Sequence, residues 1–178
     1  NENNVNSLLG DCDGIIVPGG FGNNGVEGNI CAAKYARVTN TPYFGIDLGL
    51  QVSVIEFARN VLKLADANSS EVTPDGKNNV IDLIADEQGN LADGGNVRVG
   101  AYPCKIKENS KLYKAYKSTD ISERHRHNYE FNNEYRDAFA AKGMEFSGVS
   151  PSGHYVEAIE LSNNAFHVAV QYHPEFKS

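Results

Sequence analysis

The sequence of 178 residues contains no tryptophan and only three cysteines, and none of its apolar runs approaches the ~20 residues that span a bilayer. We therefore expect no membrane anchor. Positive charge is also in short supply, since the formal net charge is -7 at pH 7. Such a surface repels a phosphate backbone, which disfavours general nucleic-acid binding. The expected partner is a small molecule or another protein.

The three cysteines, Cys12, Cys31 and Cys104, are odd in number and show no Cys-x-x-Cys spacing. The first residues show no basic region followed by an apolar stretch and a cleavage site. Both features favour a reducing, cytoplasmic setting. Because each cysteine has apolar neighbours, we expect all three to be small buried hydrophobes without a catalytic role.

The order of apolar runs and helical spacing along the chain indicates an α/β fold, and the length of the chain indicates a single domain over residues 1–178. An apolar run over 14–17 ends at Pro18-Gly19-Gly20, helical spacing follows over 26–38, and a second apolar run covers 43–46. A strand-helix-strand unit of this kind is usually parallel and right-handed. We therefore predict a mostly parallel central sheet flanked by helices on both faces.

The rest of the chain is less regular. We predict a buried helix over 48–64, because its apolar residues occur nearly all round, and a long polar surface excursion over 66–95 that could act as a lid. Short strands are predicted over 97–106, 144–149, 155–161 and 166–172, around a helix near 133–142.

Residues 43–51, Tyr-Phe-Gly-Ile-Asp-Leu-Gly-Leu-Gln, predict a buried strand, a glycine-flanked turn and a helix, with Asp47 at the apex. This pattern is typical of a nucleophile elbow, in which Gly45 and Gly49 allow close backbone approach. The backbone N–H of Leu48 and those of the Gly19-Gly20 loop could then form an oxyanion hole.

A histidine and a glutamate near the C-terminus complete a triad. His173 could act as general base, and Glu175 could hold the correct tautomer of its ring. The layout suits acyl transfer, although a carboxylate stands where the nucleophile belongs. Each piece alone is common in ordinary turns and loops, and only the joint occurrence in this order favours an active site.

Four stretches carry a wider resemblance: residues 13–28, 42–71, 122–133 and 166–178. Through them the whole chain resembles the class I glutamine amidotransferase family and, within it, the glutaminase domains of CTP synthases. The resemblance implies hydrolysis of L-glutamine through a cysteine thioester. It also implies transfer of ammonia through a tunnel to a synthetase domain that aminates UTP with ATP and Mg.

That synthetase domain and the first elements of the family's glutaminase domain are expected to be missing from this chain. No cofactor or metal is expected in the glutaminase domain itself. The resemblance further implies control by GTP at the domain junction and homo-oligomers of the full-length proteins. Oligomerisation contacts are expected mainly in the synthetase domain.

The resemblance assigns roles to individual residues. Asp47 stands at the position of the cysteine nucleophile, His173 at that of the base and Glu175 at that of the third triad member. It implies substrate contacts for nine residues: Gly20, Phe21, Leu48, Gly49, Leu50, Gln51, Glu71, Arg126 and Asn128. Among them Glu71 suits the α-ammonium group of glutamine.

Two departures from the family pattern weaken catalysis. Asp47 cannot form a thioester, and its negative charge opposes the oxyanion. We expect a severe loss of glutaminase activity, and expect His173, between two carboxylates, to hold its proton. Asn128 replaces the arginine that binds the α-carboxylate, a role for which Arg126 is the alternative.

Three explanations of Asp47 stay open. It is an engineered or recorded substitution, a covalently altered cysteine entered under another letter, or the natural residue of a homologue that has no glutaminase activity.

Several alternatives stay open. One is a non-catalytic glutamine-binding or regulatory module, and another is a γ-glutamyl hydrolase, whose specific motifs are not seen. The run over 124–127, Arg-His-Arg-His, is either a solvated edge or part of the glutamine site or a domain interface. His154 and His167 have no partners at metal-ligand spacing and are interpreted as surface or core residues.

Overall fold

The structure, a computed structural model, describes residues 2–22, 24–91 and 96–176. Its α-helices are α1 (Glu2–Leu9), α2 (Val26–Thr39), α3 (Leu48–Asn60), α4 (Lys111–Tyr116) and α5 (Arg136–Ala140). Its strands are β1 (Ile15–Val17), β2 (Tyr43–Ile46), β3 (Asn68–Ser69), β4 (Asn79–Leu83), β5 (Arg98–Ile106), β6 (Asp120–His127), β7 (Tyr129–Phe131), β8 (Met144–Val149), β9 (Val156–Leu161) and β10 (His167–Val170). Two 3₁₀ turns cover Asn133–Tyr135 and Pro174–Phe176.

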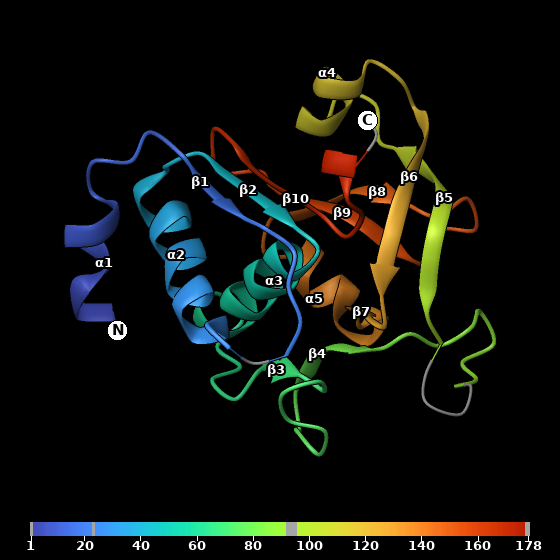
Figure 1. Cartoon of the computed structure of the whole chain (residues 1–178), viewed down its shortest axis with the longest axis horizontal. Coiled ribbons are helices and arrows are strands. Elements are labelled where there is room, and N and C mark those ends of the chain that lie inside the picture. The colour runs from blue at the N-terminus through green and yellow to red at the C-terminus, as the bar shows by residue number, and fades with distance from the viewer. Residues whose placement is uncertain (1, 23, 92–95, 177–178) are drawn as a thin grey trace.

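The main sheet is mixed, which corrects the prediction of a mostly parallel one. Its seven strands run in the order β1-β2-β10-β9-β8-β5-β6. Only the pairs β1–β2 and β2–β10 are parallel, and the other four pairs are antiparallel. The physical reason is the connections, since short turns join β8 to β9 and β9 to β10, and such turns suit antiparallel neighbours. In Figure 1 the sheet curls, and β5 and β6 cross at a steep angle to β1 and β2.

The first half follows the sequence prediction closely. The strand, helix and strand occur as β1, α2 and β2, and α2 ends at the left-handed C-cap Asn40 (φ 57°). Helix α3 begins as predicted at Leu48 but ends at Asn60, before the predicted residue 64. Lys63 adopts a left-handed conformation (φ 64°), which is incompatible with a continuing right-handed helix.

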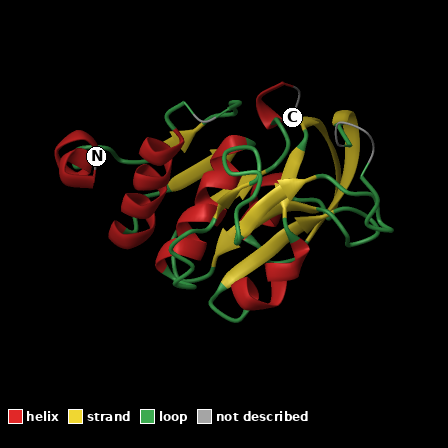
Figure 2. Cartoon of the chain, turned by 90° about the horizontal axis from the view of Figure 1, so that it is seen from below, coloured by secondary structure: helices red, strands yellow, loops and turns green. Residues whose placement is uncertain are grey.

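The core lies on both faces of the main sheet. The larger apolar cluster joins one face to α2, α3 and α5, and α3 is buried on every side from Leu48 to Ala58. A smaller cluster covers the other face, where Leu112 of α4 packs against strand residues such as Ile46 and Val170. Figure 2 shows the helices of the N-terminal half lying beside the strands. Helices therefore contribute to both faces, as predicted, although only the short α4 covers the second.

The predicted surface excursion over 66–95 is wrong for its first half. Strands β3 and β4 form a second sheet with β7, in the order β3-β4-β7. Ala67, Val80 and Ile81 are fully buried there. The polar composition of this segment predicted an exposed loop. Three of its polar residues are instead buried, because their side chains form hydrogen bonds with nearby residues: Asn68, Ser69 and Asn79. Residues 92–95 lie outside the described part of the chain.

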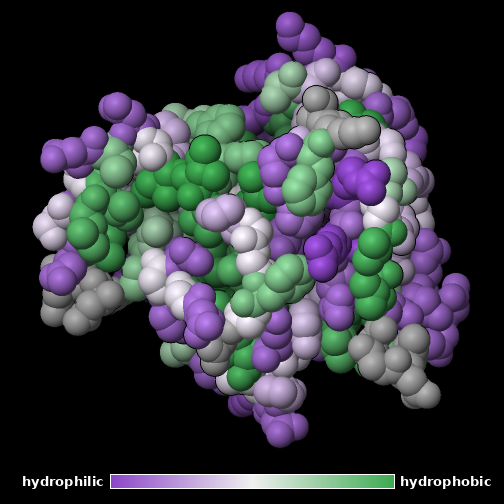
Figure 3. Space-filling model, in the orientation of Figure 1, coloured by the Kyte–Doolittle hydropathy of each residue, from purple (hydrophilic) through white to green (hydrophobic). Residues whose placement is uncertain are grey.

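The run over 124–127 is a strand, and the solvated-edge interpretation holds only for its arginines. Along β6, Arg124 and Arg126 are exposed, whereas His125 and His127 are buried. Strongly hydrophilic side chains gather over β6 in Figure 3. Cysteine burial also needs correction, since Cys104 is buried, Cys31 is half-buried and Cys12 is exposed in the polar turn after α1.

No helix in the described ranges has the length and apolarity to cross a bilayer.

Stability should depend on Gly49, because a Cβ there would lie 2.2 Å from the Val17 carbonyl oxygen. We predict that Gly49→Ala lowers the free energy of unfolding by about 1–3 kcal/mol, the usual cost of overpacking. Urea denaturation followed by circular dichroism measures this. The matched control is Gly28→Ala at an exposed position of α2, where nothing lies within 4 Å of the added Cβ and a gain of about 0.5–1 kcal/mol is expected. Equal effects of the two substitutions would contradict the prediction.

Candidate active site

The turn between β2 and α3 has the predicted elbow geometry. Asp47 at its apex has φ 51° and ψ -103°, a strained conformation for a residue with a side chain. Both flanking glycines are required, since a Cβ on Gly45 would lie 2.6 Å from the Gly49 carbonyl group and one on Gly49 would strike Val17. The Tyr43 hydroxyl donates to the Gly49 carbonyl oxygen at 2.8 Å. The turn is therefore held by backbone contacts that do not involve the Asp47 side chain.

The Asp47 carboxylate is buried, with 2% of the residue exposed. Its Oδ1 accepts a hydrogen bond from Gln171 Nε2 at 2.9 Å. Burial raises the pKa of Asp47 to about 6, although His173 and the backbone N–H groups of Leu48 and Gly20 act in the opposite direction. The two N–H groups predicted to form an oxyanion hole thus lie near the protein's own carboxylate and favour its ionised form.

His173 and Glu175 lie next to this carboxylate. His173 Nδ1 is 2.7 Å from Glu175 Oε1, and its Nε2 is 4.0 Å from Asp47 Oδ2. A carboxylate only accepts, so Nδ1 carries a proton and Nε2 faces residue 47. The ring also stacks on Phe176, with centroids 5.0 Å apart. This is the ring orientation that a general base needs.

The Gly19-Gly20 loop closes the site from β1. A Cβ on Gly19 would lie 2.8 Å from His173 Cε1, and one on Gly20 would lie 3.0 Å from Leu48 Cδ2. Sequence reasoning singled out Gly20 but missed the steric need for glycine at position 19. It also missed Gln171, the hydrogen-bond partner of Asp47. Gln171 precedes His173 by two residues, and nothing in the sequence indicates that its polar side chain is buried beside residue 47.

A small cavity of ≈ 80 Å³ adjoins the elbow. It is lined by residues from β7, β6, α3 and four connecting loops or turns: Gly20, Phe21, Asp47, Gln51, Glu71, His127, Asn128 and Tyr129. Most of the predicted substrate contacts thus come together here. Leu48, Gly49 and Leu50 instead lie in the first turn of α3, and Leu50 is fully buried in the larger core cluster. Arg126 lies nearby, with its guanidinium carbon 5.9 Å from the Phe21 ring centroid.

Hydrogen bonds tie the cavity walls together. Glu71 Oε1 accepts from the backbone N–H of Gly22 at 2.9 Å, which joins the end of β3 to the loop that carries Phe21. Gln51 Nε2 donates to the Tyr129 carbonyl oxygen at 3.4 Å, which joins α3 to β7. The segments that line the cavity are distant in sequence but cross-linked in space.

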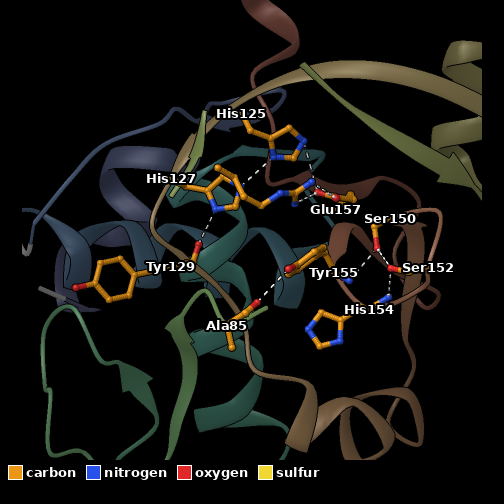
Figure 4. Close-up of polar contacts among 10 residues, drawn as sticks. Ala85, His125, His127, Tyr129, Ser150, Ser152, His154, Tyr155 and Glu157 are labelled. Atoms are coloured by element: carbon orange, nitrogen blue, oxygen red, sulfur yellow. Dashed lines mark hydrogen bonds and ion pairs between the residues drawn. The ribbon is translucent and has the colours of Figure 1, made fainter. Parts of the chain in front are cut away.

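A buried chain of polar groups leads away from the cavity (Figure 4). His127 Nδ1 lies 2.9 Å from the Tyr129 carbonyl oxygen, which can only accept, so Nδ1 carries the proton. Burial lowers the pKa of His127 to about 3, so the ring is neutral and its Nε2 accepts from His125 Nδ1 at 2.9 Å. The sequence signal for this buried pair was the alternation Arg-His-Arg-His, which has the period of a strand.

The chain ends at a buried ion pair. Arg98 Nη2 is 2.8 Å from Glu157 Oε1, and the guanidinium group lies between the rings of Tyr102 and Tyr155 at 4.5 and 4.7 Å. His125 Nε2 is 3.6 Å from Glu157 Oε2, beyond hydrogen-bond distance. The pair joins β5 to β9 behind the cavity.

His154 and His167 do not take part. His167 is buried, its Nε2 lies 2.8 Å from Ser53 Oγ, and its ring stacks on Tyr43. His154 is half-buried against Tyr155. Over the described ranges, no group of three or more His, Cys, Asp or Glu side chains is placed to hold a metal ion.

The raised pKa of Asp47 makes stability depend on pH. The folded value of about 6 exceeds the ordinary value of 3.8, so its favourable contribution is fully present below the latter and is lost as the pH rises through 6. We predict that Asp47→Asn unfolds less readily than the unsubstituted chain at pH 8, by a free energy on the order of 2 kcal/mol that shrinks toward pH 4. Thermal melts across this range measure the difference. Exposed Glu108→Gln is the control, and a difference constant with pH would refute the assignment.

Comparisons with known proteins agree with this geometry. The sequence profile described as "Glutamine amidotransferase class-I" matches residues 1–178. The chain is 57% identical over 176 residues to the CTP synthase of Lactiplantibacillus plantarum, covering 98% of this chain and 33% of that protein. It is 54% identical over 179 residues to the CTP synthase of Staphylococcus haemolyticus, covering 100% of this chain and 33% of that protein. The chain thus spans about a third of these curated relatives.

Solved structures give the same result. The glutaminase domain of Trypanosoma brucei CTP synthase, solved with bound acivicin, superposes with a TM-score of 0.92 at 42% identity, covering 99% of this chain and 68% of that one. A glutamine amidotransferase of Thermotoga maritima shares the fold alone, with a TM-score of 0.56 at 12% identity, covering 90% of this chain and 56% of that one. The chain therefore belongs to the class I glutamine amidotransferase family and is a homologue of the glutaminase domains of CTP synthases.

Proposed function

We propose that the chain is the glutaminase part of a CTP synthase, and that Asp47 silences glutamine hydrolysis while the glutamine pocket is kept. In the complete enzyme, ammonia released from L-glutamine would pass to a synthetase domain that converts UTP to CTP with ATP and Mg. GTP at the domain junction and assembly into homo-oligomers belong to the same proposal.

The observation that carries the proposal is the arrangement around the elbow. His173 Nε2 faces residue 47, Glu175 holds the opposite ring nitrogen, and the backbone N–H groups of Leu48 and Gly20 lie near enough to the residue 47 side chain to favour its ionised form. A thiol at this position would have a base within reach and donors for the oxyanion of a tetrahedral intermediate. A strained residue at the apex of the turn, beside a histidine that is paired with a glutamate, is the arrangement expected of a catalytic triad.

Asp47 removes the chemistry without dismantling the site. A carboxylate attacking an amide would form an anhydride in place of a thioester, and its charge would repel the oxyanion from the hole. Loss of a triad nucleophile typically costs about a millionfold in rate. In its present form the chain should therefore bind glutamine without turning it over at a useful rate.

The pocket offers contacts for the amino-acid end of glutamine. We assign the α-ammonium group to the Glu71 carboxylate, which the Gly22 N–H holds in place. The α-carboxylate has only the neutral Asn128 within the lining, and Arg126 beside Phe21 is the nearby cation that could replace the family's arginine. Phe21 and Gln51 supply the remaining walls.

A second candidate is a non-catalytic glutamine-binding or regulatory module. The observation in its favour is that the Asp47 carboxylate is hydrogen-bonded by Gln171 and fitted into the site. The two candidates differ in whether the catalytic apparatus is still functional once a thiol is supplied.

Restoring the thiol tests the first candidate. We predict that Asp47→Cys raises glutaminase activity by a factor on the order of 10⁴ or more, because only the nucleophile is missing from the triad. Release of ammonia from L-glutamine measures this. Asp47→Ala is the control that removes the charge without adding a nucleophile, and it should stay inactive. Adding His173→Ala to Asp47→Cys should abolish the recovered activity.

If Asp47→Cys folds, binds glutamine and yet releases no ammonia, the binding-module candidate replaces the enzyme.

Binding itself tests the pocket. We predict that L-glutamine binds the unsubstituted chain and that Glu71→Gln weakens binding about tenfold or more, because a charge-assisted contact with the α-ammonium group is lost. Isothermal titration calorimetry measures both dissociation constants. Glu108→Gln, on the exposed loop before α4, should bind as the unsubstituted chain does. An unchanged affinity of Glu71→Gln would remove Glu71 from the site.

A further inference from the structure

The charges around the cavity are unbalanced. Its described lining contains two carboxylates, Asp47 and Glu71, and no lysine or arginine, although Arg126 lies beside Phe21 and His173 Nε2 is 4.0 Å from Asp47 Oδ2. His127 in the same lining is neutral, because it donates from Nδ1 to a carbonyl oxygen and accepts at Nε2. An anionic ligand group therefore meets negative charge at both carboxylates.

The hydrogen-bond donors near the elbow surround the protein's own carboxylate. Gln171 Nε2 donates to Asp47 Oδ1, and the N–H groups of Leu48 and Gly20 lie close enough to the same carboxylate to lower its pKa. A ligand oxygen placed here would compete with Asp47 for these donors.

Acceptor capacity, in contrast, remains. Each carboxylate oxygen can accept two hydrogen bonds. His173 Nε2, at 4.0 Å from Asp47 Oδ2, is too distant to use that capacity. The end of the cavity beside Asp47 therefore offers an acceptor and a negative charge, whereas an active glutaminase site offers donors at this position.

We propose that this pocket takes α-amino acids whose side chain ends in a hydrogen-bond donor, an amide or an ammonium group, and rejects those that end in a carboxylate. The inference rests on the proposed glutamine pocket, and it names Asp47 as the specificity-determining residue. Selectivity of this kind arises from a repulsive element as much as from an attractive one.

Three amino acids separate these properties. L-glutamine ends in a neutral amide, L-ornithine ends in an ammonium group whose nitrogen occupies the same place along the side chain, and L-glutamate ends in a carboxylate of the same length. Glutamine and glutamate share the same planar shape and differ at the side-chain end in charge and donor capacity. Ornithine keeps the terminal nitrogen, lacks the carbonyl oxygen and carries a positive charge.

The test is isothermal titration calorimetry of the 178-residue chain with each amino acid at pH 8. Glutamine and ornithine should each bind at least about tenfold more tightly than glutamate, because juxtaposed like charges cost several kcal/mol at an interface. In Asp47→Asn, whose amide can both donate and accept, the gap between ornithine and glutamate should fall below about threefold. Glu108→Gln should keep the gap of the unsubstituted chain.

The outcomes are distinct. If none of the three amino acids binds, the proposed glutamine pocket is wrong and this inference fails with it. If glutamine binds but glutamate binds equally well, the pocket stands and the inference alone is overturned. A gap that persists unchanged in a folded Asp47→Asn would assign the selectivity to another residue. Circular dichroism melts establish whether Asp47→Asn folds. If it does not fold, the order of the three affinities in the unsubstituted chain still tests whether the pocket rejects a terminal carboxylate.

Discussion

The site depends on one steric constraint, the contact of three backbone segments with no side chain between them. Gly49 at the start of α3 lies directly against the Val17 carbonyl of β1, and Gly45 of β2 lies against Gly49. This approach fixes the direction of α3, whose buried Glu56 then accepts both hydrogen bonds of Arg37 on α2 at 2.8 and 2.7 Å. It also forces the strained backbone of residue 47 and aims its side chain at the edge where β1, β2 and the segment after β10 end.

Electrostatic interactions determine which charged groups the site stabilises at residue 47. The environment of residue 47 can stabilise an anion, since donors from two loops and from Gln171 converge on it. Burial works against the charge and is the largest influence on its pKa. A thiolate or a transient oxyanion at this position would benefit from the same donors. In this chain the Asp47 carboxylate is the group that these donors face.

Sequence reasoning predicted the elements with strong local signals. The apolar run of β1 before Pro18, the spacing of α2 and the glycines around Asp47 each correspond to a single dominant contact. It failed where polar residues are buried. The β3–β4 segment looked like a surface loop because its buried Asn and Ser side chains are polar and form their hydrogen bonds locally. The burial of the β6 histidines could not be decided from the sequence because Glu157 and Arg98 lie far away along the chain. The antiparallel half of the sheet likewise depends on pairings between β5, β8 and β9 that no local pattern encodes.

The Tyr43 hydroxyl, which holds the Gly49 carbonyl, has a consequence beyond geometry. Tyr43 stacks on His167, which in turn contacts Ser53, so β2, α3 and β10 are joined beneath the elbow by buried side chains. The backbone of the turn is consequently held independently of the side chain at its apex. A substitution at residue 47 can therefore change the chemistry of the site while the scaffold persists.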